Sequence, residues 1–227
     1  YMAQLTGKTQ EEIVTELQGV IFRVPNTEPA RYVAADEYLS GDVREKLKVA
    51  EIAAKQDVAL SINVEALKQV IPKDLSAAEI AVRLGTTWIP ESDIQQFVME
   101  LLTPSSHAAG RIRVRYTPYN GDWFIENKTS DFGNVKADST YGTKRASAYR
   151  IIEDTLNLKD TRIFDYVYDE HGNKKAVFNH KETTAAQAKQ EVIKQAFQDW
   201  IWKDPERRNR LVRYYNDTFN SVRPREY

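Results

Sequence analysis

The stretch Arg111–Lys128, RIRVRYTPYNGDWFIENK, decides the fold class of this chain. Apolar and polar residues alternate on both sides of Pro118–Gly121, as expected for two half-buried strands joined by a turn. The Asn-Gly pair accepts positive φ angles and predicts a two-residue hairpin turn. Such a turn gives the hairpin two faces, one with Arg113, Arg115, Thr117 and Phe124 and the other with Val114, Tyr116, Trp123 and Ile125.

Upstream of the hairpin, apolar residues recur at helical spacing. Capping side chains or a proline predict helix starts at Thr9–Glu12, Ser40, Ser76–Glu79 and Pro90. The last three of these helices are expected to end near Lys55, Gly85 and Leu102. The small, polar segment Thr103–Gly110 then predicts a boundary between a helical region, residues 1–104, and an α+β region, residues 105–227.

Downstream of the hairpin, helical and alternating patterns follow in turn. Residues 143–157 are helical in pattern, and residues 162–168 and 174–178 predict a second hairpin. Thr184–Gln187 is expected to cap a long helix, and Asp204-Pro205 to start a last helix that runs to about Asn220. The sequence therefore predicts an α+β fold, with a helical N-terminal part followed by two β-hairpins packed with three helices.

The composition is that of an ordinary globular protein, with 41% hydrophobic and 29% charged residues. No apolar run approaches the roughly 18–20 residues that span a bilayer, and the first residues do not form a signal-peptide pattern. The chain has no cysteine, which excludes disulfides, thiolate metal sites and cysteine nucleophiles. We therefore expect a cytoplasmic protein without a membrane partner.

The charge is distributed unevenly along the chain. Residues 1–110 carry 10 Lys and Arg against 16 Asp and Glu, whereas residues 111–227 carry 22 against 17. A basic second half indicates an anionic partner such as DNA. The alternative is an uneven but merely solvated surface.

The residues do not form a recognisable catalytic constellation. Gly7-Lys8-Thr9 lacks the preceding glycine of a phosphate-binding loop, and Asp169-Glu170-His171 falls in a predicted turn. Glu126-Asn127-Lys128 resembles half of a nuclease site but has no second carboxylate nearby to share a metal ion. The three histidines lack the spacing of zinc ligands. We expect no catalytic residue, no metal site and no cofactor in this segment.

The first candidate anion site is the outer face of the first hairpin. Arg113 and Arg115 lie beside Phe124 there, and cations next to an aromatic ring suit a phosphate backbone with base stacking. The alternative is an ordinary outer sheet face on which Arg115 pairs with Glu126 across the strands.

The second candidate site is Lys144-Arg145. Both cations would lie in the first turn of the helix predicted over residues 143–157, where they oppose the helix dipole. A phosphate bound to the free backbone amides would offset that repulsion. The alternative is a pair of solvated surface charges.

The third candidate site is the last predicted helix. Arg207, Arg210, Arg213 and Tyr214 lie opposite its apolar face, so the helix has a mostly basic side. The alternative is an amphipathic helix that packs on its predecessor. A further stretch, Ala78–Thr86, is similar to the start of a helix-turn-helix, but the acidic helix that follows favours a packing role.

Three stretches carry a resemblance to a known family: DEYLSGDVREKL at residues 36–47, LSAAEIAVRLGTTWIP at 75–90, and DWIWKDPERRNRLVRYYNDTFNSVRPREY at 199–227. Together they resemble the large DNA methylase/helicase proteins of conjugative transposons and phages, and the resemblance covers nearly the whole chain. It implies that this segment lies between an adenine-specific methylase and a Swi/Snf-type helicase motor. It also implies that ATP and S-adenosylmethionine are used in other domains of the parent.

The resemblance implies a non-catalytic accessory segment that contacts or positions DNA for the motor. Its partners would be DNA and the methylase and helicase domains of the parent chain. The alternative is a structural interdomain scaffold, or a protein-interaction module, without nucleic-acid contact. DNA binding that weakens steeply with salt would favour the first function. Exposed apolar surface that neighbouring domains cover would favour the second.

Overall fold

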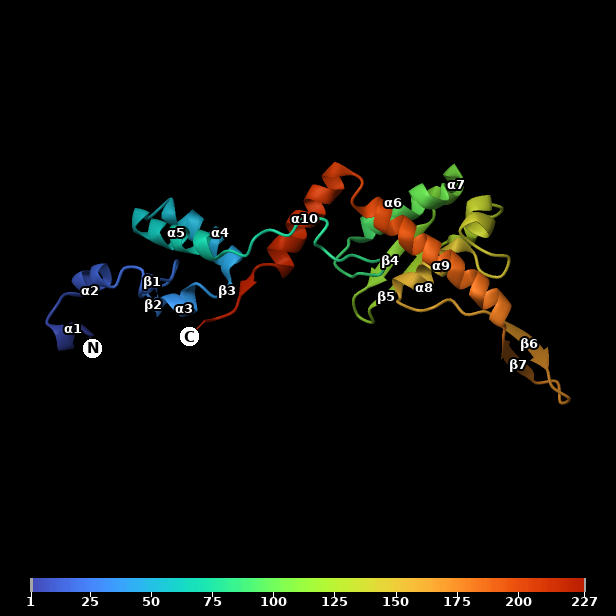
Figure 1. Ribbon diagram of the computed structural model, residues 1–227, viewed down its shortest axis with the longest axis horizontal. Helices are drawn as coiled ribbons and strands as arrows, with labels where there is room; N and C mark the ends of the chain where they lie inside the picture. Colours follow the sequence, from blue (N-terminus) through green and yellow to red (C-terminus); the bar gives the residue numbers. More distant parts are fainter. Residues whose placement is uncertain (1, 227) are drawn as a thin grey trace. The chain divides into compact units, whose positions relative to one another are not determined.

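The computed structural model describes residues 2–226 and has an α+β fold (Figure 1). Helices dominate, and the strands form four small antiparallel pairs within the described residues: β1–β2, β3–β8, β4–β5 and β6–β7. The predicted fold class and both predicted hairpins, β4–β5 and β6–β7, are confirmed.

The chain divides into two compact units. The first comprises the residues up to Glu79 together with those from Arg210 onward, and the second is Ile80–Asn209. The boundary that we predicted between residues 104 and 105 falls inside the second unit. It does so because the helix before that boundary is hydrogen-bonded to the hairpin after it, through Gln95 to Ile112 and Val114.

The first unit contains five helices and four strands among its described residues. They are α1 (Met2–Thr6), α2 (Gln10–Glu16), β1 (Ile21–Arg23), β2 (Tyr32–Ala34), α3 (Ala35–Tyr38), β3 (Gly41–Asp42), α4 (Val43–Ala54), α5 (Ser61–Val70) and β8 (Val222–Arg223). Helices α4 and α5 lie side by side (Figure 1). The core packs Phe22 and Val33 of the β1–β2 hairpin against Tyr38 and these helices, with the Phe22 and Tyr38 rings stacked at 5.0 Å.

Two helix starts in this unit can be compared with their predictions. The capping box at Thr9 and Glu12 is confirmed, with both reciprocal hydrogen bonds present. The start predicted at Ser40 is wrong, because Gly41 and Asp42 pair with β8 and Gly41 has a φ of +71°, which a right-handed helix does not allow. Helix α4 therefore begins at Val43, and the Asp42 side chain accepts a hydrogen bond from the Glu45 amide. Helix α5 was not predicted.

The second unit contains four complete helices and four strands among its described residues. They are α6 (Glu91–Leu102), α7 (Ser106–Ala109), β4 (Arg113–Thr117), β5 (Asp122–Glu126), α8 (Ala148–Leu156), β6 (Phe164–Tyr168), β7 (Lys174–Phe178) and α9 (His180–Ile201). Short 3-10 and π-helical turns occur at Lys128–Ser130 and Lys136–Thr140. Helix α10 (Pro205–Phe219) begins here and continues past the division between the units.

The β4–β5 hairpin is a core element of the second unit. Its inner face is buried, and Val114, Trp123 and Ile125 are each 3% exposed. Side chains from neighbouring segments also accept hydrogen bonds from the amides at both edges of the hairpin. Glu91 and Gln95 of α6 accept hydrogen bonds from the amides of Tyr116 and Val114. Glu153 of α8, and Asn157 directly after this helix, accept those of Ile125 and Trp123.

The helix predicted from Ser76 to Gly85 is wrong. The Ser76 amide donates to the Glu79 carboxylate, which is one half of a capping box, but the Ser76 hydroxyl also donates to that carboxylate instead of accepting the Glu79 amide. The chain then turns instead of continuing as a helix, and further along the Thr86 hydroxyl bonds both the amide and the carbonyl group of Arg83. Residues 78–86, which are similar in sequence to the start of a helix-turn-helix, therefore do not form a helix.

Two further helices begin elsewhere than predicted. Helix α8 starts at Ala148 and not near residue 143, because the Thr143 hydroxyl accepts hydrogen bonds from the amides of Arg145 and Ala146 and holds a turn there. Helix α9 starts at His180, capped by Asn179, so the predicted cap at Thr184 lies inside the helix. The last helix starts at Pro205, as predicted.

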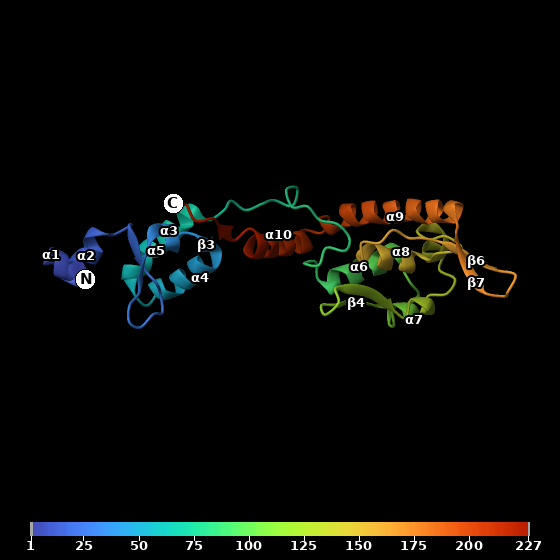
Figure 2. The ribbon, with the colours of Figure 1, turned by 90° about the horizontal axis from the view of Figure 1, so that it is seen from below.

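The β6–β7 hairpin differs from the first hairpin in its surroundings. We expected helices to pack on both hairpins, yet every residue of β6 and β7 is exposed except the half-buried Asp165. In both views this hairpin extends away from the rest of the second unit, beside the start of α9 (Figures 1 and 2).

Candidate nucleic-acid interface

The outer face of the β4–β5 hairpin has the predicted side chains but a different turn. Arg115 lies opposite Phe124 and Thr117 opposite Asp122, so four residues form the loop and the predicted two-residue turn is wrong. The observed pairing of the two strands is shifted by two residues from the pairing that a two-residue turn would give. Because side chains alternate between the faces with a period of two, the predicted division into faces is preserved. Phe124 is 39% exposed beside Arg113 and Arg115.

The two arginines of this outer face are engaged within the second unit. Arg113 donates to the carbonyl oxygens of Ala109, Gly110 and Ile112, at the end of α7. Arg115 lies 3.7 Å from the Glu126 carboxylate and 3.9 Å from that of Glu91. These contacts fit the alternative interpretation, an outer sheet face with cross-strand ion pairs.

The cations Lys144 and Arg145 lie in a loop and not in the first turn of a helix, so the proposed helix N-terminal site lacks its basis. Arg145 instead binds the base of the second hairpin. It pairs with the Asp165 carboxylate at 2.7 Å and donates to the Phe164 carbonyl oxygen at 2.9 Å. The Arg145 guanidinium, and then the Asn179 amide, hold the pKa of Asp165 below its usual value.

The predicted basic side of the last helix is wrong at Arg207. This side chain is 6% exposed, stacks 3.4 Å from the Trp200 ring centroid, and donates to the carbonyl oxygens of Trp200 and Ile201. It closes the C-terminal end of α9, where the last carbonyl groups of a helix lack partners. Helical spacing could not predict this contact, because it does not show which groups of the preceding helix pack against the side chain.

The other residues of that side lie on the surface of the first unit. Arg210, Arg213 and Tyr214 are exposed. Arg213 is paired with Asp217, one turn further along, and with Asp74 at 3.1 Å. The Asp217 carboxylate raises the pKa of Arg213. Its charge is therefore largely balanced within the unit, which fits the alternative of an ordinary amphipathic helix.

The strongest candidate interface is the second hairpin, Phe164–Phe178, which we call the hairpin arm. Its register pairs Phe164 with Phe178, Tyr166 with Ala176, and Tyr168 with Lys174. Directly paired residues share a face, so one face of the arm carries four aromatic rings and a lysine. We call this the aromatic face.

Exposure increases along the aromatic face from its base to its tip. At the base, Phe164 and Phe178 contact each other edge to face at 5.6 Å. Beyond them, Tyr166 is 58% exposed and Tyr168 is 71% exposed. The Lys174 ammonium lies 4.0 Å from the Tyr166 ring centroid, within cation–π distance.

The opposite face and the turn of the arm are different in character. The opposite face carries Asp165, Val167, Lys175 and Val177. In the turn, the Asp169 carboxylate accepts the amide hydrogens of His171 and Asn173, which lowers the pKa of Asp169. Within residues 2–226, no side chain from outside the arm hydrogen-bonds to Tyr166, Val167 or Tyr168. The arm is therefore held at its base and open along its edges.

Sequence reasoning found this hairpin but missed it as a site. The alternation Phe164-x-Tyr166-x-Tyr168 predicts one aromatic face, but the same alternation suits a face buried beneath helices. The charged residues Lys174 and Lys175 at the start of the return strand were the available signal for exposure.

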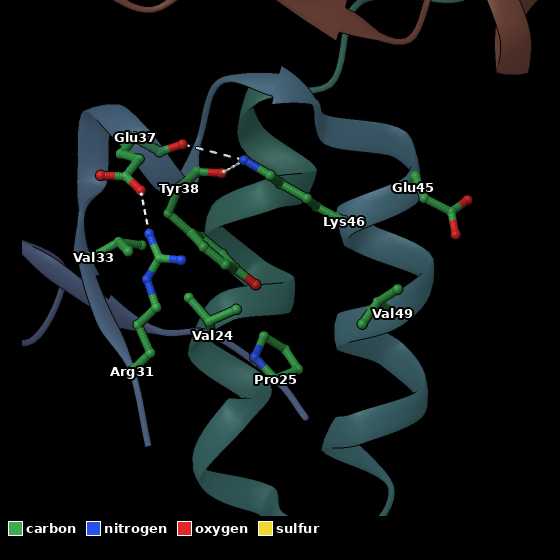
Figure 3. Close-up of a pocket in the computed structure, with 9 residues that line it drawn as sticks. All are labelled: Val24, Pro25, Arg31, Val33, Glu37, Tyr38, Glu45, Lys46 and Val49. Atoms are coloured by element: carbon green, nitrogen blue, oxygen red, sulfur yellow. Dashed lines mark hydrogen bonds and ion pairs between the residues drawn. The ribbon is translucent and has the colours of Figure 1, made fainter. Parts of the chain in front are cut away.

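A pocket of about 280 Å³ lies in the first unit, between the β1–β2 hairpin, α3 and α4 (Figure 3). Lys46 donates to the carbonyl oxygens of Glu37, Tyr38 and Ser40, and burial lowers its pKa. Arg31 pairs with Glu37 at 3.1 Å. Lys46 and Arg31 are already bonded, and the rest of the lining combines Val24, Pro25, Val33 and Val49 with Glu37, Tyr38 and Glu45, so the pocket is largely apolar.

Residues 2–226 contain neither a candidate metal centre nor a candidate membrane-spanning helix. No group of three or more His, Cys, Asp or Glu side chains there is arranged to hold a metal ion. None of the helices there combines the length and the apolar character that crossing a bilayer requires.

Residues 83–221, more than half of the chain, match the family model described as "Domain of unknown function (DUF8437)". The chain belongs to this family. The DUF8437 match includes the β4–β5 hairpin, the hairpin arm, and the long helices α9 and α10 that follow the arm.

A second and shorter match concerns the other end of the chain. Residues 1–33 are similar to the family described as "Probable helicase, winged helix domain". This stretch holds α1, α2 and β1 of the first unit. No curated protein and no solved structure matches the chain.

Proposed function

We propose that this chain is a non-catalytic accessory segment of a helicase and that it contacts DNA through the aromatic face of the hairpin arm. The observation that carries the proposal is the exposure of Tyr166 and Tyr168 beside Lys174, on a hairpin whose edges are open. Exposed aromatic rings combined with a cation are the usual elements of a surface that stacks on bases and meets phosphates.

The similarity of residues 1–33 to a probable helicase domain supports the helicase context. The resemblance of the chain to mobile-element DNA methylase/helicase proteins extends the proposal. In such a parent the segment lies between an adenine-specific methylase and a Swi/Snf-type motor, which are its partners within the chain. ATP and S-adenosylmethionine would be used by those domains and not by this one. The role requires access to DNA and therefore a cytoplasmic location.

The arm replaces the basic residues as the proposed contact. Arg113, Arg115 and Arg207 are engaged with neighbouring groups of the second unit. Arg145 contributes by fixing the base of the arm, and the exposed Lys144 lies next to it.

The proposal is tested by fluorescence anisotropy of the 227-residue chain with labelled DNA at several salt concentrations. One variant removes the aromatic face, with Tyr166→Ala, Tyr168→Ala and Lys174→Ala. A matched control removes the opposite face, with Val167→Ala, Val177→Ala and Lys175→Ala. Salt-sensitive binding that the first variant loses and the second retains is the expected result. Absence of DNA binding at low salt contradicts it.

A second candidate function has its own observation. Val167 and Val177 are exposed on the opposite face of the arm, and exposed apolar side chains mark surfaces that proteins cover. If the chain does not bind DNA but binds the isolated motor domain of its parent, and the opposite-face variant abolishes that contact, the arm is a protein-docking element.

A further inference from the structure

We infer that the aromatic face of the arm takes single-stranded DNA with its bases unstacked, one base on Tyr166 and one on Tyr168. This inference rests on the proposed function and specifies the form of DNA that the same site accepts. It follows from the spacing of the rings, from the side chains that accompany them, and from the ring contacts that Phe164 and Phe178 already make at the attached end of the arm.

The first argument is the spacing of the two tyrosines. They lie two residues apart on one strand, and a strand rises about 3.3 Å per residue, so their attachment points are roughly 6.6 Å apart. Bases in a duplex are stacked about 3.4 Å apart. Consecutive duplex bases therefore cannot each meet one ring, whereas an extended single strand with separated bases can.

The second argument is the chemistry of the face. Reading a duplex from its grooves depends on side chains such as Arg, Asn and Gln, which bond to base edges. The aromatic face carries no Arg, Asn or Gln, and its one cation, Lys174, lies over the Tyr166 ring; its members are Phe164, Tyr166, Tyr168, Lys174, Ala176 and Phe178. Stacking on rings does not depend on base identity, because every base has an aromatic face. We therefore expect little sequence preference.

The third argument fixes the number of bases. Phe164 and Phe178 contact each other, and Phe178 also contacts His180 at 4.6 Å. The rings at the base of the arm thus already have aromatic partners. Tyr166 and Tyr168 are the more exposed pair, which gives two stacking positions. Lys174 is the one cation on the face and can leave the Tyr166 ring for a phosphate.

The test measures the affinity of the 227-residue chain for a labelled oligothymidylate and for a blunt duplex of the same length. The Tyr166→Ala/Tyr168→Ala variant should bind the single strand at least tenfold more weakly than the parent chain. Tyr166→Phe/Tyr168→Phe should retain the affinity because it keeps the rings, and Val167→Ala/Val177→Ala should also retain it. Thermal melting of each variant checks that the fold is intact.

Salt dependence separates stacking from charge. The tyrosine-to-alanine variant should lower the affinity without changing the slope of log affinity against log salt. Lys174→Ala should reduce that slope by roughly 0.7, the value for one single-strand phosphate contact. Lys175→Ala, the neighbouring lysine on the opposite face, is the matched control and should leave the slope nearly unchanged.

Each remaining outcome has a distinct meaning. Equal or tighter binding to the duplex overturns the inference and leaves the proposed DNA contact in place. Single-strand binding that the tyrosine-to-alanine variant retains overturns the inference as well. If neither form of DNA binds at low salt, the proposed function fails together with the inference.

Discussion

The β4–β5 and β6–β7 hairpins have strands of the same length and similar alternation, yet only the first is part of a core. Three side chains from α6 and α8, and Asn157 at the end of α8, bond to the edge amides of the β4–β5 hairpin, and its apolar face is buried. The second is fixed at its base by Arg145 and Asn179 and is otherwise exposed. Neighbouring elements, and not the strand sequence, decide whether a hairpin stabilises a fold or remains available for binding.

The largest expected difference concerns one aromatic side chain in each hairpin. Trp123→Ala should lower the free energy of unfolding by about 3–5 kcal/mol, because it removes a buried ring from the core. Tyr166→Ala should change it by less than about 0.5 kcal/mol, as expected for an exposed side chain. Urea unfolding followed by circular dichroism measures both. Equal losses of unfolding free energy would contradict the claim that only the β4–β5 hairpin is part of a core.

A smaller effect is expected at the edge of the first hairpin. The Glu153 carboxylate accepts the Ile125 amide hydrogen at 2.7 Å and pairs with Lys128. Glu153→Ala leaves that amide without a partner and should cost about 1–3 kcal/mol of unfolding free energy. Glu191→Ala is the control on an exposed helix face and should cost less than about 0.5 kcal/mol. The result is contradicted if both variants unfold at the same urea concentration.

A local effect is expected at the base of the arm. Arg145→Ala removes the ion pair with Asp165 and the bond to the Phe164 carbonyl oxygen. Amide hydrogens of the arm should then exchange a few-fold faster, while global stability stays nearly unchanged. Lys144→Ala changes the adjacent exposed cation and should leave exchange as it is. Unaltered exchange in the Arg145 variant would show that the arm is held by other contacts.

The smallest expected effect is a pH dependence of amide hydrogen exchange in the arm. The pKa of Asp165 is lowered in the folded chain, chiefly by Arg145. Its stabilising contribution is therefore complete above the unfolded value, about 3.9, and is lost as pH falls through that value and the lower folded one. Hydrogen exchange of the arm should accelerate in this window in the parent chain. The acceleration should be smaller in the Arg145→Ala variant, in which only the Asn179 hydrogen bond to Asp165 remains.

The sequence predicted local features well and surroundings poorly. The division of Arg113, Arg115 and Phe124 from Val114, Trp123 and Ile125 followed from alternation, because a register shift of two leaves the faces unchanged. The capping box at Thr9 formed with its helix. Ser76 makes only half of the equivalent pair, from its amide to the Glu79 carboxylate, and no helix follows it.

Contacts between distant segments account for most of the errors. Ser40 does not start a helix because the following residues pair with a strand near residue 222. Arg207 is not part of a basic surface because Trp200 and the end of α9 lie against it. The exposure of the arm depends in the same way on elements that no local pattern specifies. Two strands of alternating residues cannot reveal whether a helix will cover them.

The central claim is that the arm serves binding and the first hairpin serves folding. Asp165 and Val177 are directly paired, so a two-residue Asn-Gly turn can replace residues 166–176 between them. We would measure thermal melting and binding to single-stranded DNA for this shortened chain. The account predicts that it melts like the parent chain and no longer binds the single strand. A shortened chain that fails to fold, or that binds as tightly as before, would contradict the account.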